Sequence, residues 1–180
     1  NFQVILDSGK ISFQDFEPVD WKVSLIETGV NTLTAGRVHQ MKKYVGDETF
    51  MLTYGDGVAN IDVKALLDFH KSHGRLVTIT AVHPPSRFGE LTLDGTKVSN
   101  FHEKSQMGSS WINGGYFVIE PGFFDLLKDK DTMMELQPLE EAARLGELMA
   151  YRHEGFWQCM DTKRDHERLE ELWNSTAPWK

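Results

Sequence analysis

Residues Phe50 to Gly57 form a short apolar run that stops at an acidic residue between two glycines. Such a run is typical of a buried strand whose carboxyl end presents an acid to a crevice, where open α/β sheets bind their ligands. The acid here is Asp56. We therefore expect an α/β fold with a site for a metal and a phosphate at this edge of the sheet.

A second acid, Asp161, follows another aromatic and apolar run, 155–160, and opens a segment with helical character. Two carboxylates that converge on one divalent cation are what a nucleotide-handling enzyme needs. Ordinary turn chemistry is the alternative, because Gly-Asp-Gly is common in turns and Asp is a common helix N-cap. The spacing alone leaves both interpretations open for Asp56 and Asp161.

Bulk composition limits the possible classes of protein. The chain has 180 residues, 40% of them hydrophobic, which fits one globular domain. A net charge of −8 disfavours a general nucleic-acid or membrane-surface binder, because both need a basic face. Cys159 is the only cysteine, which excludes an internal disulfide framework and a cysteine zinc site. We therefore expect a cytoplasmic protein without nucleic-acid or membrane partners.

Hydrophobic periodicity predicts alternating strands and helices in the first half of the chain. The expected elements are a hairpin of strands 2–6 and 11–16, a strand at 21–26, a helix at 32–45, the strand that ends at Asp56, a helix from 61 to about 74 and a strand at 76–82. This order predicts right-handed crossovers and a partly parallel sheet.

The pattern changes after residue 85. The expected elements are an antiparallel hairpin of strands 89–93 and 97–103, a strand at 116–119, helices at 121–127 and 138–145, and a final amphipathic helix at 162–173. Internal repeats and linkers are absent from the sequence, so a second domain is not expected.

Six short motifs occur in one order along the chain and end with Ala177-Pro178-Trp179-Lys180. They are Glu27-Thr28-Gly29 with Thr34-Ala35-Gly36-Arg37, Thr53-Tyr54-Gly55-Asp56-Gly57, Pro84-Pro85-Ser86-Arg87-Phe88-Gly89, Phe101-His102-Glu103-Lys104, Trp111-Ile112-Asn113-Gly114-Gly115-Tyr116-Phe117 and Gly155-Phe156-Trp157-Gln158-Cys159-Met160-Asp161-Thr162. Each motif alone is a weak signal, but six in register are a strong one. Through essentially its whole length the chain resembles the sugar-1-phosphate nucleotidyltransferases.

This resemblance implies a fold and a reaction. The fold is the nucleotide-diphospho-sugar transferase fold, a Rossmann-like α/β sandwich with a mixed sheet. The implied reaction, with Mg²⁺, converts CTP and α-D-glucose 1-phosphate to CDP-glucose and pyrophosphate, for deoxysugar or O-antigen-type polysaccharide synthesis by a homo-oligomer. A transferase that uses UTP, dTTP or GTP and a non-catalytic sugar-phosphate-binding fragment are the alternatives.

The resemblance also assigns site residues. Asp56 and Asp161 correspond to metal ligands and, with Lys104, to the catalytic set. The implied nucleotide contacts are Asn31, Gly36, Arg37 and Gly55, and the implied sugar-phosphate contacts are Glu103, Lys104, Asn113 and Gly114. Two structural explanations are alternatives to this assignment. Lys104 and Glu103 also suit a solvated ion pair, and a helix start explains polar residues near Asn31 and Arg37 equally well.

The chain departs from the family pattern in two places. The family begins with a strand and a phosphate-binding loop, Gly-Gly-x-Gly-Thr-Arg, and the first residues here match the middle of the family instead. We therefore expect residues 1–180 to be the C-terminal portion of a single nucleotidyltransferase domain, incomplete at the N-terminus and inactive alone. Cys159 stands where close relatives usually carry proline, beside the second acid.

Overall fold

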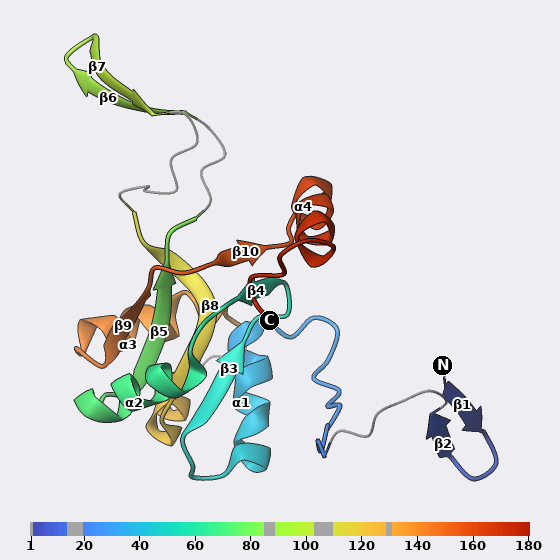
Figure 1. Cartoon of the computed structure of the whole chain (residues 1–180). Coiled ribbons are helices and arrows are strands. Elements are labelled where there is room, and N and C mark those ends of the chain that lie inside the picture. Colours follow the sequence, from blue (N-terminus) through green and yellow to red (C-terminus); the bar gives the residue numbers. More distant parts are fainter. Residues whose placement is uncertain (1, 14–19, 85–88, 103–109, 129–130) are drawn as a thin grey trace.

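The computed structural model describes residues 2–13, 20–84, 89–102, 110–128 and 131–180 (Figure 1). The elements in chain order are β1 (Phe2–Ile5), β2 (Lys10–Phe13), α1 (Thr34–Val45), β3 (Phe50–Thr53), β4 (Gly57–Ala59), α2 (Val63–His73), β5 (Val77–Val82), β6 (Glu90–Asp94), β7 (Lys97–His102), β8 (Ile112–Ile119), the 3₁₀ helix η1 (Pro121–Leu126), α3 (Gln137–Arg144), β9 (Leu148–His153), β10 (Trp157–Cys159) and α4 (Lys163–Trp173).

A four-stranded mixed sheet in the order β3-β8-β5-β9 forms the centre of the fold. Strand β8 is antiparallel to both β3 and β5, and β5 is parallel to β9. The expectation of an α/β fold with a partly parallel sheet is therefore confirmed. Which strands are parallel neighbours was not predicted. The antiparallel β8 lies between β3 and β5, and β5 pairs in parallel with β9, a strand that the periodicity did not predict.

Strand β3 corrects one expectation. The apolar run before Asp56 was predicted to be buried, but β3 lies at the edge of the sheet and alternates along its length. Phe50 and Leu52 are half-buried and pack against the core, whereas Met51 is 44% exposed. An edge strand with one face on the core shows this period of two.

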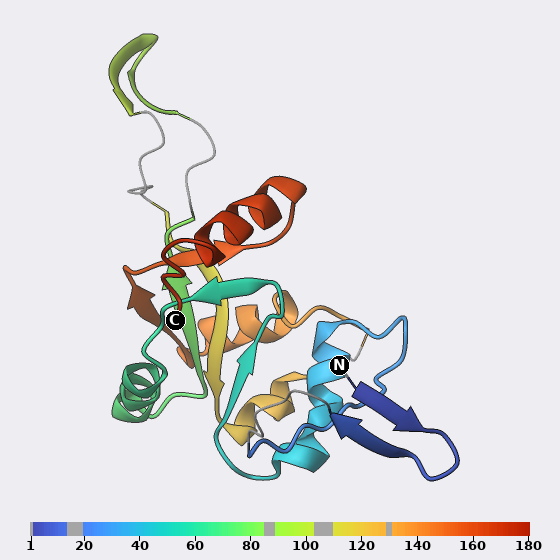
Figure 2. The same cartoon turned by 45° about the vertical axis from the view of Figure 1, so that its right-hand side comes forward.

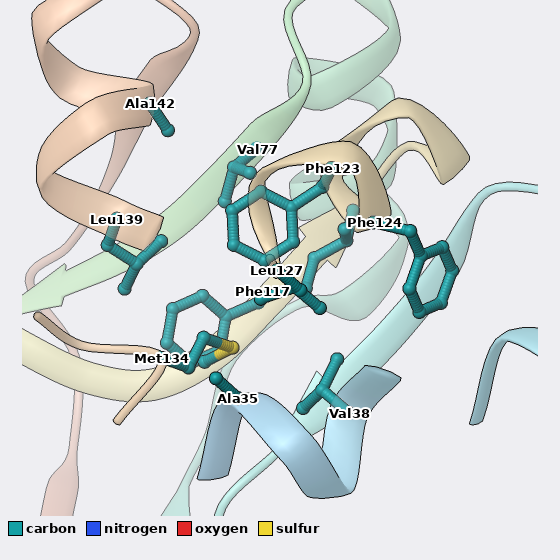
Figure 3. Packing of buried hydrophobic residues seen from close by; sticks show 11 residues of the cluster. Ala35, Val38, Val77, Phe117, Phe123, Phe124, Leu127, Met134, Leu139 and Ala142 are labelled. Carbon is teal, nitrogen blue, oxygen red and sulfur yellow. The ribbon is translucent and has the colours of Figure 1, made fainter. Parts of the chain in front are cut away.

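Helices cover the sheet on both faces. Helix α2 contacts β5, β8 and β9, and its buried Leu66 and His70 face the sheet. On the other face α1, η1 and α3 enclose the hydrophobic core (Figure 3). The buried residues of this core are Ala35, Val38, Val77, Phe117, Ile119, Phe123, Phe124, Leu127, Met134, Leu139 and Ala142. The predicted α/β sandwich is therefore confirmed, and its core is built from both halves of the chain.

The helix ends follow local sequence signals. Helix α2 has Asp62 as its N-cap, whose side chain accepts from the Ala65 N–H. It ends beside Gly74, as predicted, and Gly74 adopts the left-handed conformation. Helix α4 has a capping box, in which Thr162 is the N-cap and Asp165 the reciprocal partner. Asp161 is therefore not the N-cap of this helix. The helix expected at 121–127 is present and is a 3₁₀ helix, Pro121–Leu126.

The strand predicted at 21–26 is wrong. Residues 20–33 contain no regular strand in the described structure, and Trp21, Val23 and Leu25 are largely exposed. Apolar alternation produces a strand only where a neighbouring strand completes the hydrogen-bond ladder, and none of the described strands pairs with this segment.

Two hairpins form separate two-stranded sheets, as predicted. Strand β1 pairs with β2 and strand β6 with β7, each antiparallel. Figure 2 shows both hairpins away from the central sheet. Across the described ranges, none of the helices combines the length and the apolar character needed to span a bilayer.

Candidate functional site

The two acids singled out in the sequence are brought together by a short strand pair. Strand β4 pairs antiparallel with β10, so that Gly57 lies opposite Cys159. The Met160 N–H donates to the Asp56 carbonyl oxygen at 2.8 Å, which continues this pairing. Asp56 therefore precedes one strand and Asp161 follows the other, at the same end of the pair. The periodicity predicted neither strand.

A cavity of about 320 Å³ lies at this end of the sheet. Its walls come from the end of β3, the β4 and β10 pair and the start of β8. The lining residues are Thr53, Tyr54, Asp56, Gly57, Ile112, Asn113, Gly114, Gly115, Tyr116, Trp157, Cys159 and Asp161. Four of the residues predicted for the site, Asp56, Asp161, Asn113 and Gly114, therefore line one cavity.

Both acids offer carboxylate oxygens to this cavity. Asp56 and Asp161 are exposed, and the half-buried Cys159 thiol donates to Asp161 Oδ2 at 3.3 Å. In the described part of the chain, no group of three or more His, Cys, Asp or Glu side chains gathers as a metal cluster. Two carboxylates are enough for Mg²⁺, which keeps several waters and is completed by substrate phosphates. The oxygen donors present therefore fit that ion.

Asn113 is held in the cavity wall by two hydrogen bonds. Its Nδ2 donates to the Tyr54 hydroxyl at 3.0 Å, and its Oδ1 accepts from the Gly115 N–H at 2.8 Å. The Tyr54 hydroxyl donates to Glu135 Oε1 at 2.5 Å, and Thr34 Oγ1 donates to Glu135 Oε2 at 2.8 Å. Burial, and then the Glu135 carboxylate, raise the pKa of the Tyr54 phenol above its usual value. Tyr54 is therefore a neutral hydroxyl at physiological pH.

Two aromatic side chains fix the backbone around the cavity. Trp157 Nε1 donates to the Gly114 carbonyl at 2.8 Å, and the Tyr116 hydroxyl donates to the Gly57 carbonyl at 3.0 Å. Burial raises the pKa of Tyr116, so its hydroxyl also stays protonated. These bonds join β10 to β8 and β8 to β4, which makes the cavity wall one connected unit.

Packing explains the two glycines of the cavity wall. A Cβ at Gly114 would lie 2.7 Å from Val82 Cγ1 and 3.0 Å from the Thr80 carbonyl oxygen. Gly115 has φ +79°, and a Cβ there would lie 2.8 Å from the Tyr54 ring. Gly114 is required because Val82 and Thr80 leave no room for a Cβ, and Gly115 because of its positive φ and the nearby Tyr54 ring.

The residues predicted to contact the nucleotide do not line this cavity. Gly55 is exposed and directly precedes Asp56. Gly36 is buried within α1. Arg37 is exposed and donates to Thr28 Oγ1 at 2.5 Å and to the Val30 carbonyl at 3.3 Å, which ties the preceding loop to α1.

Asn31 lies in the turn before α1, whose N-cap is Leu33. Asn31 is therefore not the cap of that helix. Glu103 and Lys104, predicted for the sugar-phosphate side, lie outside the described residues. The roles of all these residues stay predictions.

Sequence reasoning missed several residues of the site. Tyr54, Tyr116 and Trp157 stand inside the motifs, but no role was predicted for them. Glu135 lies outside every motif and reaches Tyr54 across 81 residues of sequence. A pattern in a single sequence carries no signal for such a contact, because only the packing of the loop before α3 against β3 creates it.

Comparisons with known proteins agree with this geometry. The nucleotidyl transferase family model matches residues 8–163. The chain is 49% identical over 162 residues to glucose-1-phosphate cytidylyltransferase of Salmonella typhi, covering 89% of this chain and 63% of that protein. It is 46% identical over 159 residues to the probable glucose-1-phosphate cytidylyltransferase of Bacillus subtilis, covering 88% of this chain and 62% of that protein.

A solved structure shares the fold. HddC from Yersinia pseudotuberculosis matches with a TM-score of 0.64 at 22% identity, over 86% of this chain and 68% of HddC. The chain spans less than two thirds of the length of the two cytidylyltransferases. The family model covers most of the chain, and its match includes both acids of the cavity. The chain therefore belongs to the nucleotidyl transferase family.

Proposed function

We propose that the protein containing this chain transfers a cytidylyl group from CTP to α-D-glucose 1-phosphate, giving CDP-glucose and pyrophosphate. The observation that carries the proposal is one cavity lined by Asp56, Asp161 and Asn113, in a chain 49% identical to a glucose-1-phosphate cytidylyltransferase. The proposal includes a single nucleotidyltransferase domain, a homo-oligomer and a place in surface-polysaccharide synthesis, all supported by the family resemblance.

The proposed reaction needs no side-chain nucleophile. A phosphate oxygen of the sugar phosphate attacks the α-phosphorus of the nucleotide, and pyrophosphate leaves. The protein must hold two mutually repelling anions in line, so positioning and charge neutralisation supply the catalysis. The two exposed carboxylates of Asp56 and Asp161 would hold Mg²⁺. When bound there, this ion would neutralise negative charge on the phosphates of both reactants.

The other predicted residues have positioning roles in this proposal. Lys104 would act as a point charge on the sugar phosphate beside Glu103. Asn113 offers a neutral hydrogen-bond donor from the cavity wall, which suits a sugar oxygen, and Gly114 presents backbone close to it. Asn31, Gly36, Arg37 and Gly55 would contact the nucleotide, as the family resemblance implies.

Pyrophosphate release by the full-length native protein tests the proposal. The protein is incubated with glucose 1-phosphate and Mg²⁺, and CTP, UTP, dTTP and GTP are supplied in turn. We expect release with CTP and formation of CDP-glucose, identified by its mass. Equal or faster release with another nucleotide would reassign the base. Binding of glucose 1-phosphate without release from any nucleotide would favour a non-catalytic sugar-phosphate-binding protein.

A further inference from the structure

We infer that Glu135, which does not line the cavity, is a positioning residue that fixes the carboxamide of Asn113 so that an N–H donor faces the substrate. The inference rests on the proposed function for the identity of the acceptor, an oxygen of the sugar phosphate. Its structural part stands on hydrogen bonds alone. The chain of bonds runs from Thr34 through Glu135 and Tyr54 to Asn113.

The direction of each bond follows from the groups that take part. An ionised carboxylate only accepts, so the Tyr54 hydroxyl gives its single proton to Glu135 Oε1. The Tyr54 oxygen then presents only lone pairs to Asn113, and only the NH₂ end of the amide can meet them. Glu135 thereby decides which end of the Asn113 carboxamide faces Tyr54.

A second bond agrees with this orientation. The Gly115 N–H donates to Asn113 Oδ1 at 2.8 Å, and a flipped amide would place two donors against each other there. Among the described residues, Tyr54 is the only partner of Asn113 Nδ2. The second N–H of that nitrogen therefore remains available to the cavity that Asn113 lines.

The carboxylate is itself held in place. Thr34 Oγ1 accepts from the Met134 N–H at 2.7 Å, so its own proton goes to Glu135 Oε2 at 2.8 Å. Both oxygens of Glu135 are thus occupied, one by α1 and one by the cavity wall. Because the side chain is half-buried and held at both oxygens, it has one orientation in which to receive the Tyr54 proton.

Glu135→Gln separates positioning from packing, because it keeps the shape and removes one acceptor. A carboxamide has one accepting and one donating end, so either Tyr54 or Thr34 loses its acceptor. We expect kcat/KM for glucose 1-phosphate to fall about tenfold, the equivalent of one hydrogen bond, with the KM for CTP unchanged. The matched control is Glu140→Gln, an exposed glutamate in the first turn of α3, which is expected to match wild type.

A double variant distinguishes positioning of Asn113 by Glu135 from a purely structural role of Glu135. If Glu135 acts through Asn113, adding Glu135→Gln to Asn113→Ala costs no further activity. Losses that multiply in the double variant would overturn the inference. So would a drop in thermal stability that accompanies equal increases in both KM values.

A measurement without substrate keeps the test independent of the proposed reaction. In ¹⁵N spectra of the full-length native protein, the side-chain amide protons of Asn113 are identified by their absence in Asn113→Ala. We expect Glu135→Gln, and not Glu140→Gln, to shift these protons and speed their exchange with solvent. Unchanged protons in both Glu135→Gln and Glu135→Ala would overturn the positioning role, because alanine offers no acceptor to the Tyr54 hydroxyl. Shifted protons in a protein that releases no pyrophosphate would retain that role and reject the proposed function.

Discussion

Two polar networks lie at opposite ends of the β3–β8 strand pair, and they differ in one instructive respect. At one end, Tyr54 and Asn113 form the wall of the cavity. At the other end, beneath α2, the buried His70 bonds to Thr78 at 2.7 Å and to Glu120 at 3.0 Å. Both networks join a strand to a helix or loop, so burial and hydrogen bonding alone do not tell them apart.

The network beneath α2 is closed. The Arg75 N–H donates to His73 Nδ1, so His73 donates from Nε2 to Thr78 Oγ1 at 2.8 Å. Thr78 then donates its own proton to His70 Nδ1, and His70 Nε2–H donates to Glu120. Every histidine nitrogen in this chain of bonds has a partner. The cavity network instead ends in an amide N–H without a protein partner among the described residues, and in the proposed function this N–H is the donor that meets the substrate.

Removing either acid of the cavity is expected to change catalysis more than any other substitution considered. In the full-length native protein, Asp56→Asn or Asp161→Asn is expected to lower turnover by roughly 100- to 1,000-fold, because in the proposed function each removes a negative charge that would hold the cation. The fold is expected to stay intact, because both side chains are exposed. Steady-state kinetics with thermal unfolding measure both quantities. Asp47→Asn, an exposed turn residue, serves as the control, and turnover retained in both variants would refute the metal assignment.

Removing His70 from the closed network is expected to lower the free energy of unfolding and to leave catalysis unchanged. His70→Ala removes the acceptor of the Thr78 hydroxyl proton and one of the two donors to Glu120 Oε1, at a site where His70 is 1% exposed. We expect a loss of about 2–4 kcal/mol in the free energy of unfolding. The kcat/KM measured well below the unfolding temperature is expected to be unchanged.

Urea denaturation of the full-length native protein measures this loss, with the exposed His39→Ala as control. A fall in kcat/KM at full folding would show that the two networks are coupled. That result would end the distinction between an open functional network and a closed structural one.

How much of this could be predicted from sequence depends on how local the signal is. The ends of α2 and α4 follow from Asp62, Gly74 and Thr162, because caps act within one turn. The acids Asp56 and Asp161 were predictable because each directly follows an apolar run. That the two acids line one cavity was implied by the family resemblance, whereas their spacing left it open. The β4–β10 pair that brings them together has three residues in each strand, which is too few for a periodic signal.

The wrong and the missed predictions concern features that depend on contacts between residues far apart in sequence. The 21–26 segment alternates like a strand, yet Trp21 and Leu25 are exposed in the described structure because pairing decides whether such a segment forms a ladder. Strand β9 was missed although it supplies the parallel contact to β5. Glu135 was beyond prediction, because its role depends on two hydrogen bonds to residues far away in sequence.

A third prediction separates backbone conformation from contact at the cavity wall. Gly115→Ala places a methyl group 2.8 Å from the Tyr54 ring at φ +79°, so we expect a loss of about 1–3 kcal/mol in unfolding free energy and reduced kcat/KM. Gly146→Ala is the matched control, because Gly146 has φ +72° and a Cβ there meets no atom within 4 Å. Equal stability losses with unchanged kcat/KM in both variants would show that the Tyr54 contact has no consequence.

The smallest effect is a pH dependence at the closed network. Burial, and then the neighbouring His70, lower the pKa of His73 from its usual value of 6.5. Protonation of His73 therefore favours the unfolded state. The stability from neutral His73 is complete above pH 6.5 and is lost as the pH falls through the lower folded-state pKa.

Glu120 titrates in a separate window. Burial alone would raise its pKa, but hydrogen bonds from Thr49 and His70 outweigh it and lower the pKa below 4.5. The stability from ionised Glu120 is complete above pH 4.5 and is lost as the pH falls through the folded-state value. The interval from about pH 7.5 to about pH 5.5 therefore isolates His73 from this carboxylate.

Unfolding temperatures of wild type and His73→Gln across that interval test this assignment. Glutamine can keep a donor toward Thr78 without titrating, so the variant is expected to lose less stability on acidification than wild type. His39→Gln, an exposed histidine on α1, is expected to follow wild type. If His73→Gln and wild type lose stability in parallel, His73 is not held neutral by its neighbours. The bond from the Arg75 N–H to His73 Nδ1 would then be the one to reject, because a protonated His73 donates from both ring nitrogens and cannot accept from Arg75.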